Sequence, residues 1–157
     1  MAYPIIELIA RNIEETLRGV QTEGAYNNRL KVQRYNRHGN TIEDSAAIII
    51  QDEPDLVDDG AATGTMEWNQ PFAIVLYAAQ SEAVDETMSI DQRLNLMRSD
   101  VEKALVANHT SRTRGGYAMD TRLQAPNRGD TENGLDAVIV NVTVNYRTDT
   151  TDPYTQR

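Results

Sequence analysis

The chain has 157 residues, a formal net charge of −9 and no cysteine. This length suits one domain with a single core. The acidic balance argues against general affinity for nucleic-acid phosphates, which takes surplus lysine and arginine on one face. Without cysteine, the sequence excludes disulfides, thiolate metal sites and cysteine nucleophiles.

Hydropathy and the first residues favour a soluble, intracellular protein. Residues 1–15 (MAYPIIELIARNIEE) have no positively charged stretch before the apolar residues and contain acidic residues early, unlike a signal peptide. No apolar run approaches the roughly 20 residues that a bilayer-spanning helix needs.

The first predicted element is an amphipathic helix that begins near Pro4 and ends near Gly19. Its apolar residues recur at spacings of three and four: Ile6, Ile9, Ile13, Leu17 and Val20. Proline suits the first helical turn, where its missing N–H costs nothing. Residues 29–36 alternate weakly and predict a strand, which a turn at 38–41 ends.

Two short apolar runs predict buried strands. Residues 45–51 (SAAIIIQ) and 72–79 (FAIVLYAA) carry apolar side chains on both faces. Residues 52–70 between them predict a long acidic loop. Because the helices can cover only one face of a sheet, the second apolar face predicts a contact with another copy of the chain.

The second predicted helix is marked by a capping box, with Ser89 as N-cap and Gln92 at the third helical position. Its apolar stripe follows at helical spacing: Ile90, Leu94, Met97, Val101 and Leu105. We expect this helix to end near Asn108.

The remaining residues predict strands and turns. Gly115 and Gly116 indicate a turn before a strand at 117–124, and residues 125–134 predict a turn-rich loop. Residues 138–146 alternate as a half-buried strand does. One face is expected in the core: Val138, Val140, Val142, Val144 and Tyr146. The other is expected to point outward: Ile139, Asn141, Thr143 and Asn145.

These elements predict an α+β fold, with an antiparallel or mixed β-sheet of about four to five strands and two helices packed on one face. We expect residues 1–146 to form the single domain and residues 147–157 to form a polar C-terminal tail. Ordering such a tail costs about 1–2 kcal/mol per residue, and it has few apolar groups to fold on itself. We therefore expect it to dock on a neighbouring subunit through Pro153 and Tyr154.

The sequence carries no recognisable catalytic, cofactor or metal motif. His38 and His109 lie in a predicted turn and just past a helix, outside any metal-binding or triad pattern. The acidic residues at 52–59 do not follow the EF-hand spacing that calcium requires. We expect no enzyme activity, no cofactor and no metal.

Four arginines lie between residues 112 and 128: Arg112, Arg114, Arg122 and Arg128. Two interpretations are open. They pair with the chain's own acidic excess on a solvated surface, or they form a patch that meets the acidic loop of a neighbouring subunit.

The order of these segments resembles the tail terminator (tail completion, minor tail) proteins of tailed bacteriophages. The resemblance covers nearly the whole chain and is carried by AAIIIQDEP, FAIVLYAA, the helix LNLMRSDVEKALVAN running into RTRGGYAMD, and the closing VIVNVTVNYRTDTTDPY. The longer acidic loop at 52–65 departs from the family pattern and leaves that loop's role open.

The resemblance implies a structural virion protein of the neck or tail end, assembled in the cytoplasm of the bacterial host. Its copies would form a ring, usually a hexamer, that caps the tail tube and joins it to the head connector or another neck protein. DNA would pass through without specific binding, and no membrane would be involved. Candidate interface residues are Arg112, Arg114, Tyr146, Arg147, Pro153 and Tyr154. Candidate lumen residues, whose charge would repel DNA, are Asp55, Asp58 and Asp59.

Three other functions stay open at this point. The nearest is another neck protein (a head-completion or connector ring) or a tail tube component of the same virion. A small hydrolase or nucleotide-binding enzyme would need a nucleophile–base pair or a phosphate loop. A soluble binding module of a bacterial host would be a stable monomer with a ligand-sized pocket.

Overall fold

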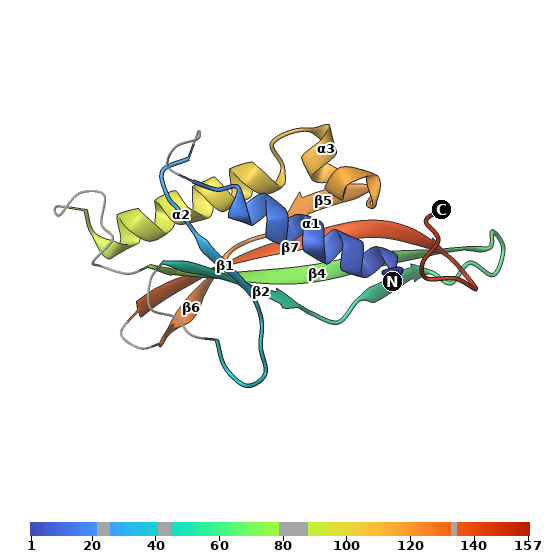
Figure 1. Cartoon of the computed structure of the whole chain (residues 1–157), viewed down its shortest axis with the longest axis horizontal. Coiled ribbons are helices and arrows are strands. Elements are labelled where there is room, and N and C mark those ends of the chain that lie inside the picture. The colour runs from blue at the N-terminus through green and yellow to red at the C-terminus, as the bar shows by residue number, and fades with distance from the viewer. Residues whose placement is uncertain (22–25, 41–44, 79–87, 133–134) are drawn as a thin grey trace.

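A long antiparallel pair of strands runs through the middle of the molecule (Figure 1). In this computed structural model, which describes residues 1–21, 26–40, 45–78, 88–132 and 135–157, β4 (Thr65–Ala78) pairs with β7 (Leu135–Asp149). The register runs without a break from Thr65 opposite Asp149 to Ala78 opposite Asp136. The other strands extend the sheet outward from both edges of this pair.

The sheet has seven strands and is mixed. β1 (Lys31–Arg34) runs parallel to β2 (Ala46–Gln51), and every other pairing is antiparallel. The remaining strands are β3 (Asp55–Asp58), on the edge of β4, and β5 (Asp120–Leu123) and β6 (Asn127–Glu132), both on the edge of β7. The predicted α+β class is confirmed, with more strands than expected.

Two long helices, α1 (Ile5–Arg18) and α2 (Ile90–Leu105), lie side by side on one face of the sheet (Figure 1). The main core lies between them and the sheet. It contains the predicted face of β7 and the stripes of both helices, including Ile9, Ile13, Met97, Val101 and Val142, all fully buried. The alternation predicted for residues 138–146 is therefore confirmed.

The capping box predicted for the second helix is present. Ser89 Oγ accepts from Gln92 N, and Gln92 Oε1 accepts from Ser89 N. α2 ends at Leu105, three residues before the expected end. Asn108 does not close α2. Its side chain caps the short helix α3 (His109–Arg112), and a single 3₁₀ turn, η2 (Arg114–Gly116), follows.

A buried carboxylate fixes the segment between α1 and β1 to α2. Asp100, 3% exposed, accepts from the backbone N–H groups of Asn27 and Asn28, each at 2.9 Å. It also accepts from both asparagine side chains. Four donors offset the cost of burying this charge. The sequence analysis did not single out Asp100, because its partners lie more than 70 residues away.

The second face of the sheet carries a smaller apolar cluster made of Ala46, Ile48, Val75, Tyr77 and Ala137. All five are at least nine-tenths buried within the single chain. The prediction that these strands are apolar on both faces is confirmed. The chain itself covers this cluster, so the cluster does not require a second copy, and oligomerisation stays a prediction that rests on other surfaces.

Residues 52–70 were wrongly predicted to form a loop. Residues 55–58 form β3, and β4 begins at Thr65 and passes through Pro71. Pro71 is tolerated in β4 because the strand it faces is interrupted there. Residues 52–54 link the end of β2 to the start of β3, so regular strand pairing is broken at this position. The buried Gln70 side chain donates to the carbonyls of Asp52 and Pro71 and fixes this junction.

Residues 125–134 were also predicted to form a loop, but Asn127–Glu132 form β6. Gly129 pairs with Ala137 on β7, and a Cβ at Gly129 would lie 2.7 Å from Ala137 Cβ. Glycine, which weakens a strand signal in sequence, here allows the close approach of two strands. Residues 133–134 lie outside the described residues.

Within the described ranges, no helix has both the length and the apolar character to cross a bilayer.

The core register gives a direct test. Val140→Asp and Leu94→Asp each place a charge at a site at most 6% exposed, so we expect a loss of roughly 4 kcal/mol or more, enough to abolish folding. Asn141→Asp is the control. It loses donations from Nδ2 to Ala125 O and Asn127 Oδ1, which cost about 1 kcal/mol each. Urea unfolding measures all three, and a reversed order would refute the register.

Candidate inter-subunit surface

An acidic hairpin projects at one end of the sheet. We define it as residues 52–66, which comprise β3, its turn and the first residues of β4, and it extends past the start of α1 (Figure 1). Its acidic side chains are all exposed: Asp52, Glu53, Asp55, Asp58 and Asp59. Among the described residues, none of the five forms an ion pair. The hairpin is a concentrated negative surface.

The hairpin also exposes two aliphatic side chains that the sequence analysis missed. Leu56 is 48% exposed and Val57 is 52% exposed, although both lie in a strand. β3 pairs only with β4 in the described part of the sheet, so its outer edge is open. The signal in the sequence was the apolar pair inside DLVD, which the surrounding carboxylates obscured.

The turn of the hairpin is built by short side-chain contacts. Asp58 Oδ1 accepts from Gly60 N at 2.8 Å, and Asp59 Oδ1 accepts from Ala61 N at 2.9 Å. These are Asx turns, in which a carboxylate replaces a backbone acceptor. Of the lumen candidates, Asp58 and Asp59 therefore also shape the turn. Asp55 makes no such bond with the described residues, so its carboxylate is available for an outside partner.

A polar ladder supports the base of the hairpin. Glu67 and Arg147 are direct cross-strand partners, with Arg147 Nη2 2.8 Å from Glu67 Oε2. Asn145 Nδ2 donates to Glu67 Oε1 and Asn69 Oδ1. The hydrogen bond from Arg147, with that from Asn145, lowers the pKa of Glu67. Arg147 is therefore held by its own chain, at 42% side-chain exposure.

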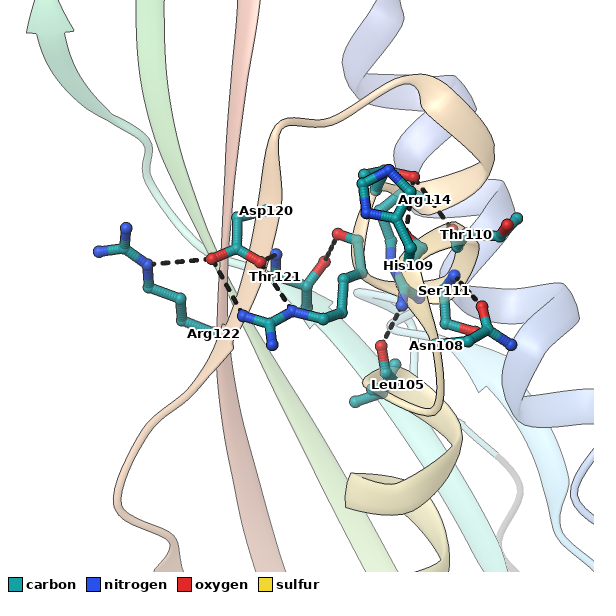
Figure 2. Close-up of polar contacts among 11 residues, drawn as sticks. Leu105, Asn108, His109, Thr110, Ser111, Arg114, Asp120, Thr121 and Arg122 are labelled. Carbon is teal, nitrogen blue, oxygen red and sulfur yellow. Dashed lines mark hydrogen bonds and ion pairs between the residues drawn. The ribbon is translucent and has the colours of Figure 1, made fainter.

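The four arginines between residues 112 and 128 do not form one patch. Arg112 and Arg122 both contact Asp120, at 3.0 Å and 3.4 Å (Figure 2). Arg128 lies apart, on β6, 3.9 Å from Asp91. The structure thus favours pairing within the chain for Arg112 and Arg122.

Arg114 is fully buried and is removed from the surface (Figure 2). Its Nη2 donates to the carbonyl of Leu105 at the end of α2, where a cation complements the helix dipole. Its backbone has φ of 51°, followed by Gly115 and Gly116, also at positive φ. Burial lowers the pKa of Arg114 to about 10, so it remains protonated at neutral pH. Its role as an interface residue is corrected to that of a helix cap.

Tyr146 is likewise buried by its own chain. It is 6% exposed in the main core, and burial raises its pKa to about 12. Its packing is therefore explained within its own chain, and a role of Tyr146 at an interface stays a prediction.

The C-terminal residues fold back on the domain, contrary to the prediction that they cannot. Residues 147–149 continue β7, and we call residues 150–157 the C-terminal hook. Asp149 N donates to Thr155 O, and Asp149 Oδ2 accepts from Arg157 Nε at 2.9 Å. Ile5 N donates to Pro153 O, so the hook also caps the start of α1. Hydrogen bonds rather than apolar contacts fix the hook.

Tyr154 is 52% exposed. Pro153 is exposed, and it borders a small depression of about 140 Å³ that Ile6, Trp68 and Tyr146 also line. Whether a neighbour covers Tyr154 stays a prediction.

The residues considered for chemistry are dispersed. His38 and His109 are both exposed and lie on different elements. Across the described ranges, no group of three or more histidine, aspartate or glutamate side chains is placed to hold a metal ion.

No protein-family model matches the chain, and a search of curated proteins returned no match.

Gly60 at the turn gives the first test of the hairpin. Its φ is +76°, and a Cβ would lie 2.9 Å from the Thr65 backbone and collide with Thr150 Cγ2. Gly64 is the matched control, with φ of +72° and open space around it. Both alanine variants bear the left-handed cost of about 1–2 kcal/mol, and Gly60→Ala should lose roughly 1–3 kcal/mol more from overpacking. Equal losses in thermal unfolding would contradict this contact.

The hook should open at low pH. Hydrogen bonds from the Thr151 backbone and from Arg157 lower the pKa of Asp149 from 3.8 to about 2. A depressed pKa means that this contribution is complete above about pH 4 and is lost as the pH falls towards 2. NMR signals of Thr151 and Arg157 should shift in that window and should not titrate in Asp149→Asn. A midpoint near pH 4 would show that the carboxylate is not held.

Proposed function

We propose that this protein is a ring-forming tail terminator of a tailed phage, which caps the tail tube and joins it to the head connector. The proposal starts from the whole-chain sequence resemblance. The α+β fold, with an uninterrupted central strand pair and one projecting hairpin, is compatible with a subunit that uses its ends for assembly.

The observation that carries the proposal is the acidic hairpin. Five exposed carboxylates lie on one projecting element without an ion pair among the described residues. Repulsion among these five carboxylates opposes the folding of the hairpin, and no lysine lies within residues 52–66 to offset it. A surface that must repel a passing polyanion gives this arrangement a physical purpose.

In the proposed ring, the turn end of the hairpin faces the bore, with Asp58 and Asp59 nearest to the axis. DNA that passes a wall of fixed negative charge is repelled from all sides and does not adhere. Arg112 and Arg122, which share the carboxylate of Asp120, stay away from the bore.

The C-terminal hook supplies a second contact in this proposal. The hook is already ordered on its own domain, so docking on a neighbouring subunit or ring costs less entropy than ordering a free tail. Tyr154 is its exposed aromatic group, and aromatic side chains are common anchors at interfaces.

Electron microscopy tests the function. We expect a closed ring, usually six-fold, for the concentrated protein or at the junction of tail tube and head in virions that contain it. One or two isolated copies at that junction would refute the proposal, and so would a stable monomer with a ligand bound in a pocket.

The hook contact has its own variant. Tyr154→Ala should leave the melting temperature of the monomer unchanged, because the side chain is exposed, and should weaken ring assembly about tenfold or more. Tyr117→Ala, at a tyrosine that is 36% exposed, is the control and should assemble normally. Sedimentation velocity measures both. Equal assembly of the two variants would remove Tyr154 from the interface.

A further inference from the structure

A groove lies between α2 and the strands β6 and β7, with a volume of about 460 Å³. We call it the α2–β7 groove. Its apolar lining includes Leu94, Pro126 and Val138, and its polar lining includes Asn95, Arg98 and Arg128. It therefore combines aliphatic surface with two cations and one carboxylate, Asp91, on a chain whose net charge is −9.

The two arginines of the groove form only weak ion pairs within their own chain. Arg128 lies 3.9 Å from Asp91, and the two side chains are 75% and 71% exposed. Arg98 contacts Glu102 at 3.2 Å and keeps 37% of its side chain exposed. Exposed pairs of this kind contribute at most about 1 kcal/mol, so both arginines can exchange partners at little cost.

We infer that the α2–β7 groove binds β3 of a second copy of the chain. β3 offers the complementary pattern, with two exposed aliphatic side chains, Leu56 and Val57, between the carboxylates of Asp55 and Asp58. The aliphatic pair packs against the apolar lining, and Asp55 meets the arginines. The contact itself does not depend on the proposed function. Only the expectation that it closes a ring rests on that function.

β6 and β3 lie at opposite ends of the same sheet (Figure 1), and the groove lies at the β6 end. Leu56 is paired with Trp68, and Ala137, in the groove lining, is paired with Tyr77. Nine residues along β4 separate these positions, or about 30 Å at the rise of a strand. A chain cannot fill its own groove, so the contact is head-to-tail and generates a ring or a filament.

One four-residue strand in a groove is smaller than a standard stable interface. Each contact is therefore weak alone, and ring closure strengthens it because every subunit then makes two. In this arrangement Asp55 lies in the contact between subunits, and Asp58 and Asp59, at the turn, face the proposed bore.

Disulfide trapping tests a weak contact directly, because the chain has no cysteine of its own. Val57→Cys and Asn95→Cys are mixed as full-length proteins and oxidised mildly. Both positions are exposed, and Asn95 lines the groove. The control partner is Ala107→Cys, which is exposed just past the end of α2 and lies outside the groove lining. We expect the Val57–Asn95 pair to give about ten times more mixed disulfide, the factor that a contact of 1.4 kcal/mol produces.

A charge exchange separates specific docking from simple collision. Arg128→Glu in the Asn95→Cys protein should lower the yield, and Asp55→Lys in the Val57→Cys protein should restore it. Circular dichroism confirms that both charge variants are folded. Equal yields for the Asn95 and Ala107 partners would overturn the inference, as would a dominant Val57–Val57 disulfide, which would mean that β3 pairs with itself.

The outcome is distinguishable from that of the proposed function. A specific cross-link with open filaments in the electron microscope supports the contact and refutes the ring. A closed ring without the cross-link supports the ring and refutes this contact.

Discussion

The pairing of β4 with β7 is the constraint on which the rest of the structure depends. Side chains alternate along both strands, so a slip of one residue would move every core residue of β7 to the outer face. The unbroken register sets the face on which α1 and α2 pack, and it positions β2 and β3 on one edge and β5 and β6 on the other. It also continues past the helices, where it forms the base of the acidic hairpin.

Two buried charges attach the helices to this frame. Asp100 binds the segment that leads into β1, and Arg114 binds the last carbonyl of α2. The hydrogen bonds of each charge form only when the two segments are in one relative position, whereas apolar contacts allow small shifts between packed elements. The hydrophobic core thus supplies the driving force for packing the helices. Asp100 fixes the segment before β1 against α2, and Arg114 fixes the end of α2.

The two ends of the sheet differ in charge and in shape. One end carries a projecting hairpin with an exposed aliphatic pair and with carboxylates that form no ion pair among the described residues. The other end carries a groove lined by two arginines and by Asp91. A subunit with unlike, complementary ends is suited to closed or open chains of identical copies.

The sequence by itself determined both long helices, the buried strand runs and the alternating register of residues 138–146. These signals are local, because hydrophobic period and capping depend on residues a few positions apart. Only the tertiary structure decided that residues 55–58 and 127–132 are strands. Each pairs with the strand that follows it in the chain, but its charges or glycine, and the proline just before it, weaken the local strand signal. It also decided which arginines are available. Arg114 and Arg128 look alike in sequence, yet one is buried under a helix end and the other is exposed beside a groove, because burial is set by what packs around a residue.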